Sequence, residues 1–299
     1  MTSRSLRAFA GVALVSMLST LVATAPAPTS AAPARERLQA APCTKSAKPF
    51  GVGKTTVTLP VAGGRSLTTT IYYPTPSGAE GEDVPPACGH FPLVLAAHGS
   101  EGTGATAADL HAYLVRYGYV VAGPTFPAGF DLTRDARDAS EVITGVLAGD
   151  RSGALPFSGH LRRFRIGFIG TSLGGMIGIT TYRKCCLDPR IDAVIAKLAT
   201  KYGTGYRWGQ GPPLLMINGT ADTVVAYDGA LATYRRARPD KGLISLAGIG
   251  HDLLLRGDPI LQESSLGFFG HYLKGSDTGL GRLRRAVDNS SVATLRNNW

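Results

Sequence analysis

The sequence lacks the features that mark several large classes of protein. Among its 299 residues, 17% are charged, and the only long apolar run lies at the N-terminus. A protein with several membrane spans is excluded, because each span needs about 20 apolar residues. The 38 glycines do not follow a Gly-X-Y period, which excludes a collagen. There is no C-x-x-C pair and no cluster of histidines, so we expect neither a zinc site nor any other metal site.

The excess of positive charge does not carry the pattern of a nucleic-acid-binding protein. The 31 Lys and Arg outnumber the 21 Asp and Glu, which gives a formal net charge of +10. No basic helix with interleaved aromatic residues is present, so we expect no nucleic-acid partner. The short basic clusters at 162–163, 235–236 and 282–285 predict a solvated basic surface. A loose association with an anionic cell envelope stays open.

The N-terminus has the order of segments typical of a secretory signal peptide. Arg4 and Arg7 precede an uncharged apolar stretch, residues 8–22, and small residues follow it. The apolar stretch is short for a transmembrane helix, although an uncleaved anchor remains the alternative. We therefore expect a secreted protein with a signal peptide over residues 1–32 and a linker or N-terminal arm over 33–49.

The predicted export favours disulfide bonds among the four cysteines, because disulfides persist in oxidising compartments. They are Cys43, Cys88, Cys185 and Cys186, and four cysteines allow three pairings. A Cys43–Cys88 bridge would tie the N-terminal arm to the body and leave Cys185 and Cys186 as an adjacent pair or as two thiols. The crossed pairings are equally open.

The body of the chain alternates short apolar runs with stretches of helical periodicity. An antiparallel hairpin is expected first, and then strands and helices that alternate as in βαβ units. The expected strands are Val52–Leu59, Leu67–Tyr73, Phe91–Ala97, Tyr119–Ala122, Arg165–Ile169, Ile191–Ala196, Leu214–Ile217 and Leu243–Leu246. The expected helices are Ala107–Arg116, Leu132–Leu147, Leu173–Lys184, Ala226–Arg236 and Pro259–Leu273. This pattern predicts one α/β domain, residues 50–275, with a mostly parallel sheet of about eight strands and helices on both faces. Residues 276–299 are polar and basic and are expected to form a C-terminal tail.

A candidate nucleophile stands between an expected strand and an expected helix. Residues 170–174 read Gly-Thr-Ser-Leu-Gly, a G-x-S-x-G motif centred on Ser172. A lone match is weak, but strand–turn–helix is the setting that a nucleophile elbow requires. The flanking glycines avoid a clash between a Cβ atom and the neighbouring strand and helix.

A base and an orienting acid follow Ser172 in the order typical of this arrangement. Asp222 comes just after the strand 214–217, and His251 comes just after the strand 243–246. The carboxyl ends of parallel strands share one edge of a sheet, so we expect the three side chains to meet there. They would form a Ser-His-Asp triad.

Other acids and histidines fit these roles less well. Asp228 is the alternative acid, but it lies at the start of an expected helix and is typical of a capping or surface residue. Asp252, beside His251, is expected to be solvated or a local hydrogen-bonding partner. His271 lies on a helical face with Phe268 and Leu273, which is typical of core packing or of the surface. His90, His111 and His160 lack a comparable position.

An oxyanion hole is expected from two backbone amides. One belongs to Leu173, directly after the candidate nucleophile. The other belongs to Ser100, in the glycine-rich loop His98–Gly104 that follows a buried strand. The order of glycines in this loop is not that of a dinucleotide-binding fingerprint.

Together these motifs resemble the α/β-hydrolase superfamily over residues 50–275. The resemblance rests on Ile71–Pro74, Ala97–Ser100, Tyr117–Pro124, Gly170–Gly175, Asn218–Asp222 and Gly250–His251. Within the superfamily, their order is similar to secreted bacterial esterases of the dienelactone-hydrolase-like and platelet-activating-factor-acetylhydrolase-like kinds. Dienelactone hydrolases proper have a Cys nucleophile, whereas this chain has Ser172. Cutinase-like polyester hydrolases are also similar, but they carry an aromatic oxyanion residue and a Trp where this chain has Ser100 and Ala199–Tyr202.

The resemblance implies a serine esterase that needs no metal or organic cofactor. The expected substrate is a small-molecule or lipid-like carboxylic ester, in a site without a large cap domain. Phe126 and Trp208 are candidate walls of an acyl pocket, and packing on the protein surface is the alternative for both. An envelope acyltransferase or a polyester hydrolase would use the same triad, and a non-catalytic binding protein would use the scaffold alone.

Overall fold

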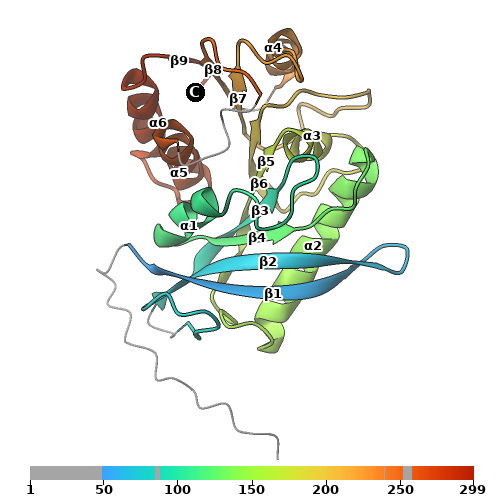
Figure 1. Ribbon diagram of the computed structural model, residues 1–299, viewed down its shortest axis with the longest axis vertical. Helices are drawn as coiled ribbons and strands as arrows, with labels where there is room; N and C mark the ends of the chain where they lie inside the picture. Colours follow the sequence, from blue (N-terminus) through green and yellow to red (C-terminus); the bar gives the residue numbers. More distant parts are fainter. Residues whose placement is uncertain (1–48, 85–87, 239, 252–257) are drawn as a thin grey trace, which may run out of the picture. The chain divides into compact units, whose positions relative to one another are not determined.

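A nine-stranded mixed sheet is the centre of the described chain in the computed structural model (Figure 1). The structure describes residues 49–84, 88–238, 240–251 and 258–299. The expected signal peptide, and the expected N-terminal arm except residue 49, lie outside these residues. The strands are β1 (Gly51–Val61), β2 (Arg65–Thr75), β3 (Phe91–Ala97), β4 (Val120–Pro124), β5 (Leu161–Thr171), β6 (Ile191–Lys197), β7 (Leu214–Gly219), β8 (Lys241–Leu246) and β9 (Ala293–Asn297). The helices are α1 (Ala108–Arg116), α2 (Leu132–Ser152), α3 (Leu173–Thr180), α4 (Tyr227–Arg236), α5 (Pro259–Lys274) and α6 (Gly279–Asp288).

The strand order places the carboxyl ends of six parallel strands along one edge of the sheet. The strands lie side by side in the order β1-β2-β4-β3-β5-β6-β7-β8-β9. Strands β4, β3, β5, β6, β7 and β8 pair in parallel, whereas β1, β2 and β9 pair antiparallel with their neighbours. The loops that leave β3, β5, β7 and β8 therefore emerge at the same edge, which is where open α/β sheets place their sites.

Helices cover both faces of the sheet, as expected for strands with long apolar runs. One buried cluster includes residues of α2, α3 and α4, and the other includes residues of α1, α5 and α6. All seven residues of β3 are buried. The chain is thus an α/β protein with a mostly parallel sheet between two helical layers.

Local sequence explains where the two longest helices begin and end. Asp131 caps α2 by accepting a hydrogen bond from the Arg134 N–H, and Gly153 ends the helix at a φ of 79°. In α5, Asp258 is the N-cap, Pro259 occupies the first turn, and Gly275 ends the helix at a φ of 68°. Side-chain acceptors at the start and glycine at the end satisfy backbone groups that the helix itself leaves free.

The expected count of about eight strands was one too low for the described part of the chain. The additional strand, β9, lies within residues 276–299, which the sequence predicted as a tail, and α6 lies there too. Strand β9 pairs with β8 from Leu246↔Ala293 to Gly242↔Asn297, and Leu283 and Val287 of α6 are buried. The strand is short and half-buried, so it lacks the continuous apolar run that identified the central strands.

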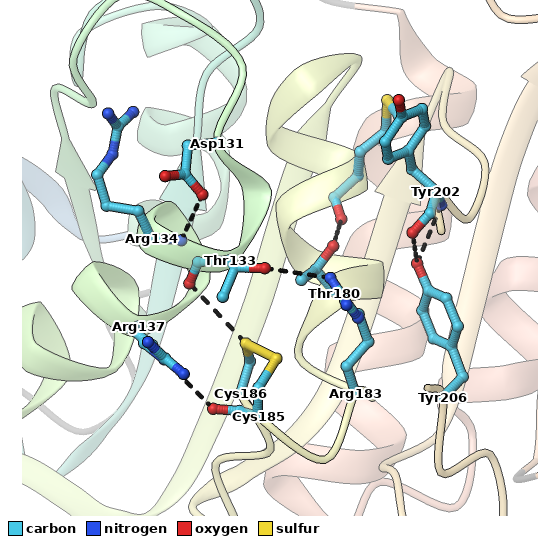
Figure 2. Close-up of a disulfide and its surroundings, with 11 residues drawn as sticks. Asp131, Thr133, Arg134, Arg137, Thr180, Arg183, Cys185, Cys186, Tyr202 and Tyr206 are labelled. Carbon is cyan, nitrogen blue, oxygen red and sulfur yellow. Dashed lines mark hydrogen bonds between the residues drawn. A yellow bond between two sulfur atoms is a disulfide. The ribbon is translucent and has the colours of Figure 1, made fainter. Parts of the chain in front are cut away.

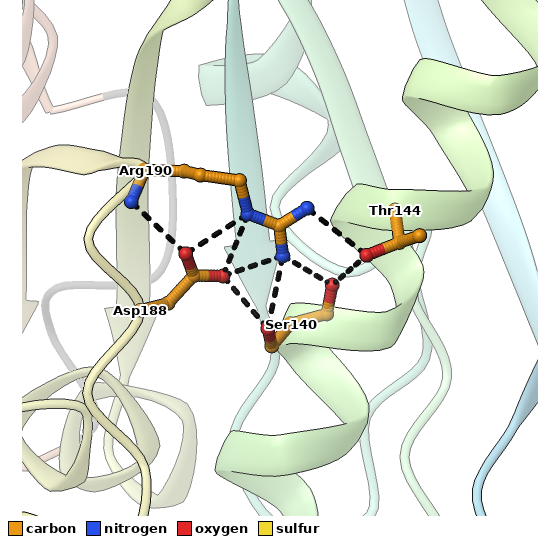
Figure 3. A network of polar contacts seen from close by, with 4 residues as sticks. All are labelled: Ser140, Thr144, Asp188 and Arg190. Atoms are coloured by element: carbon orange, nitrogen blue, oxygen red, sulfur yellow. Dashed lines mark hydrogen bonds and ion pairs between the residues drawn. The ribbon is translucent and has the colours of Figure 1, made fainter.

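A charged network fixes the loop before β6 to helix α2 (Figure 3). The Arg190 guanidinium donates to the Asp188 carboxylate at 2.7 Å, to the Ser140 carbonyl oxygen at 2.8 Å and to the Thr144 hydroxyl at 2.9 Å. Burial raises the pKa of Asp188, but the hydrogen bonds from Arg190 and Ser140 outweigh burial and hold that pKa below its ordinary value. The network joins residues that are far apart in the sequence and so holds the loop before β6 against α2.

Adjacent cysteines form a disulfide close to the same helix. Cys185 and Cys186 are bonded to each other, and the Arg137 side chain donates to the Cys185 carbonyl oxygen (Figure 2). Cys88 is also disulfide-bonded. The structure thus gives the adjacent pairing that the sequence left open, whereas Cys43 lies outside the described residues.

Candidate active site

Ser172 occupies a sharp turn between β5 and α3. Its φ of 54° and ψ of −120° differ from those of the strand before it and the helix after it. A Cβ atom at Gly170 would lie 2.2 Å from the Gly174 carbonyl oxygen, and one at Gly174 would lie 2.1 Å from the Ala97 carbonyl oxygen. The turn is held further by the Ser172 N–H, which donates to the Lys197 carbonyl oxygen at 2.8 Å. The two glycines of the motif are therefore required by backbone crowding.

His251 joins the Ser172 hydroxyl to a buried carboxylate. Its Nε2 lies 3.0 Å from Ser172 Oγ, and its Nδ1 lies 2.8 Å from Asp222 Oδ2. An ionised carboxylate only accepts hydrogen bonds, so Nδ1 carries the proton and Nε2 is left as the acceptor for the serine hydroxyl. The structure thus brings together three residues that are far apart in the sequence, in the geometry that a general base requires.

Backbone hydrogen bonds hold Asp222 in place. The Asp222 side chain is fully buried, and its Oδ1 accepts the Val224 N–H at 2.9 Å and the Val225 N–H at 2.8 Å. The loop that carries Asp222 also contacts the loop that carries His251, because the Ala221 N–H donates to the Ile249 carbonyl oxygen at 3.0 Å. Both oxygens of the carboxylate are engaged, and only Oδ2 faces the imidazole.

The alternative residues lie elsewhere. Asp228 is exposed in the first turn of α4, and Asp252 lies outside the described residues. His271 Nδ1 contacts the Ser276 carbonyl oxygen at 3.2 Å at the end of α5. His160 Nδ1 contacts the Gly89 carbonyl oxygen at 2.6 Å. Among the histidines in the described part of the chain, only His251 has a side chain within hydrogen-bonding distance of the Ser172 hydroxyl.

The glycine-rich loop after β3 reaches the candidate nucleophile. A Cβ atom at Gly99 would lie 3.4 Å from Ser172 Cβ, and Ser100 comes next in the chain. Within the described residues, the amides of Ser100 and Leu173 have no hydrogen-bond acceptor. Leu173 begins α3, so the positive end of the helix dipole lies beside Ser172. The first turn of α3 has no acidic residue that would offset this positive end. The structure therefore leaves both expected oxyanion donors unengaged.

His98, which sequence reasoning left without a role, holds this loop in shape. The Phe126 N–H donates to His98 Nε2 at 2.9 Å, so the other nitrogen, Nδ1, carries the proton and donates to the Gly99 carbonyl oxygen at 2.6 Å. A Cβ atom at Gly102 would lie 2.8 Å from His98 Cβ. The only hint in the sequence was the position of this histidine directly before the glycine-rich loop.

The two candidate pocket walls pack mainly against other protein groups. Phe126 is only 4% exposed, and its ring lies 5.8 Å from the ring of His98. Trp208 stacks on Tyr206 with ring centroids 4.7 Å apart. Phe126 therefore offers little surface to a substrate, and Trp208 has one face covered.

The described residues contain no group of three or more His, Cys, Asp or Glu side chains that could hold a metal ion. Within the same residues, no helix combines the length and apolar character that a membrane span needs. Comparison with models of protein families gives no match, and comparison with curated proteins gives no significant match.

Proposed function

We propose that this protein is a serine hydrolase that cleaves carboxylic esters on the α/β-hydrolase fold that its sequence resembles. The observation that carries the proposal is the pair of hydrogen bonds through which His251 connects Ser172 to Asp222. A serine hydroxyl is a weak nucleophile near neutral pH, and an imidazole held in this way activates it. The strained position of Ser172 and the free amides beside it support the same chemistry.

The reaction begins when Ser172 Oγ attacks the ester carbonyl carbon and its proton passes to His251 Nε2. The negative charge that develops on the carbonyl oxygen is stabilised by the N–H groups of Ser100 and Leu173. Asp222 accepts the Nδ1 proton and stabilises the imidazolium ion. The intermediate then collapses, His251 protonates the leaving alcohol, and an acyl-enzyme remains.

Water completes the cycle. His251 Nε2 removes a proton from a water molecule, the resulting hydroxide attacks the acyl carbon, and the same amides hold the second oxyanion. The carboxylic acid leaves, and the proton returns from His251 to Ser172. No step needs a group other than the protein and water.

The surface around the carboxyl ends of the strands favours small-molecule or lipid-like esters. No helix occurs in residues 198–213, which connect β6 to β7. Three exposed apolar side chains lie on the loops after β4, β6 and β7: Phe130 at 54%, Tyr202 at 58% and Val224 at 70%. An uncapped site suits short acyl chains better than emulsified long-chain fat. A panel of fluorogenic esters from acetyl to palmitoyl tests this, and a strong preference for palmitoyl would contradict it.

A polyester hydrolase is the second candidate, and one observation favours it. The exposed rings of Phe130 and Tyr202 meet edge to face with centroids 4.9 Å apart. Such a pair offers an aromatic surface to a polymer chain. Release of soluble products from an aliphatic polyester film tests this candidate. Product analysis with an added alcohol acceptor distinguishes hydrolysis from acyl transfer.

Secretion is part of the proposal. The order of basic, apolar and small residues over positions 1–32 supports it, because that order is typical of a secretory signal peptide. N-terminal sequencing of the protein from the culture medium is expected to begin near residue 33, and an intact N-terminus would contradict this.

Labelling by a fluorophosphonate probe tests the proposed enzyme class directly. The probe reacts with an activated serine, so we expect labelling of the wild type and none of Ser172→Ala. Ser66→Ala is the matched control, because Ser66 is exposed on β2, and this variant is expected to label like the wild type. A wild type that does not label, or a labelled Ser172→Ala, would contradict the proposal.

A further inference from the structure

An ammonium group without a counterion is buried beside the candidate active site. Lys197 ends β6 and is only 3% exposed. Side chains alternate along a strand, so Lys197 shares the sheet face of Ala193 and Ile195, which α1 and α5 cover. Within the described residues, its side chain has no hydrogen bond or ion pair. Burial lowers the pKa of Lys197 to about 8, so the group still carries its charge at neutral pH.

The side chain of Lys197 lines a small cavity of about 30 Å³. The cavity lies between the end of β3, the first turn of α1 and the end of β5. Its other lining residues include Ala97, Ala107, Leu110, His111 and Thr171. This volume holds about one or two water-sized particles, so an organic substrate does not fit. None of the lining residues carries a carboxylate.

The groups around the cavity attract negative charge. Helix α1 begins at Ala108, and its N-cap residue, Ala107, has no side chain that could accept a hydrogen bond from the first turn. The first turn of α1 therefore has no side-chain cap, and the positive end of the helix dipole lies at the cavity. The acidic residue of that turn, Asp109, is exposed.

His111 adds an unpaired polar group to the same cavity. It is only 4% exposed, and its Nδ1 is buried without a hydrogen-bond partner. Burial first, and then the charge of Lys197, lower the pKa of His111 to about 3, so the imidazole is neutral. A neutral imidazole presents one N–H donor, which suits an anion beside the ammonium group.

We propose that this cavity binds one small monovalent anion, chloride in a physiological medium, between Lys197 and His111. A buried cation without a partner is costly, and an ion of opposite charge removes that cost. Water alone would fill the volume but leave the charge uncompensated. Phosphate and organic carboxylates are too large for it. This proposal does not depend on the proposed ester hydrolysis.

A bromide experiment tests the site directly, because bromide replaces chloride and scatters anomalously. Crystals of the wild type soaked in sodium bromide are expected to show an anomalous peak in contact with Lys197 Nζ. Lys197→Met is expected to lose the peak. Lys54→Met, which removes an exposed lysine from β1, is expected to retain it. A wild type without the peak, or a Lys197→Met crystal with it, overturns the proposal.

Thermal unfolding gives a second test in solution. An anion that binds only the folded state raises the Tm, and the Tm rises further as the anion concentration increases. In sodium chloride, compared with sodium gluconate at equal ionic strength, we expect the wild type and Lys54→Met to gain on the order of 3 °C. Lys197→Met is expected to gain none. Equal Tm values for the wild type in the two salts overturn the proposal, and this comparison stands even if Lys197→Met does not fold.

Discussion

His98 and Phe126 connect two loops at the carboxyl edge of the sheet, because the Phe126 N–H donates to His98 Nε2 at 2.9 Å. The same imidazole donates from Nδ1 to the Gly99 carbonyl oxygen, one residue before the proposed oxyanion donor Ser100. One side chain therefore fixes the path of the backbone that faces the candidate nucleophile.

Replacing His98 should impair the reaction more than substrate binding. His98→Phe removes both hydrogen bonds and loosens the Ser100 amide, so we expect kcat for a p-nitrophenyl ester to fall about 10-fold to 100-fold with little change in KM. His98→Asn keeps a donor for Gly99 and should recover part of the loss. His90→Phe is the control, since His90 is exposed. A KM effect alone, without a change in kcat, would argue against this role.

Neutralising Asp222 should nearly abolish activity without unfolding the protein. Asp222→Asn removes the charge that stabilises the imidazolium and allows the wrong tautomer of His251. The expected loss in kcat is on the order of 10³-fold to 10⁴-fold. Asp228→Asn, in the exposed first turn of α4, should stay near wild type. Circular dichroism checks that both variants are folded, and equal activities of the two would rule out Asp222 as the triad acid.

Gly174, the last residue of the G-x-S-x-G motif, should not tolerate a methyl side chain. A Cβ atom at position 174 would lie 2.1 Å from the Ala97 carbonyl oxygen, so backbone must move. We expect Gly174→Ala to lower the free energy of unfolding by about 3 kcal/mol, measured by urea denaturation. Gly209→Ala is the matched control, because a Cβ atom there has no neighbour within 4 Å. Similar stability of the two variants would show that the turn is less crowded than described.

The buried lysine should make stability depend on pH above about pH 8. Its pKa is lowered from 10.5 to about 8 by burial, so the unfolded chain binds more protons between these values. The stability of the wild type relative to Lys197→Met should therefore rise across this range, by about 3 kcal/mol in total, and be constant below it. Urea denaturation in chloride-free buffers from pH 7 to pH 10.5 measures this, with Lys54→Met as the control. A difference that does not vary with pH would be incompatible with a charged, buried Lys197.

The central fold was predictable because its strands carry continuous apolar runs. In β3 all seven residues are buried, and a run of this kind is typical of a strand covered on both faces. The positions of Ser172, Asp222 and His251 followed from the same reasoning, since each stands where such a strand ends.

Other features could not be predicted because they depend on contacts between distant residues. The sequence shows Lys197 as the polar end of an apolar run, and nothing local indicates that its charge is buried. The role of His98 depends on Phe126, which the sequence placed in the wall of a pocket, whereas the structure buries its ring. Helix α6 and strand β9 have weak periodicity, and only their packing on the domain defines them.

The pairing of β9 with β8 also covers a strand edge that would otherwise promote aggregation. Five of the six residues of β8 are buried, and as an outermost strand it would offer a free row of backbone donors and acceptors to another copy of the chain. Instead the outermost strand is β9, which is shorter than β8 and carries Arg296 and Asn297. The ring of Trp299 packs near the ring of Phe268, with centroids 5.9 Å apart. Loss of the last seven residues would therefore expose the edge of β8 to pairing with strands of other copies of the chain, and the first visible effect would be aggregation.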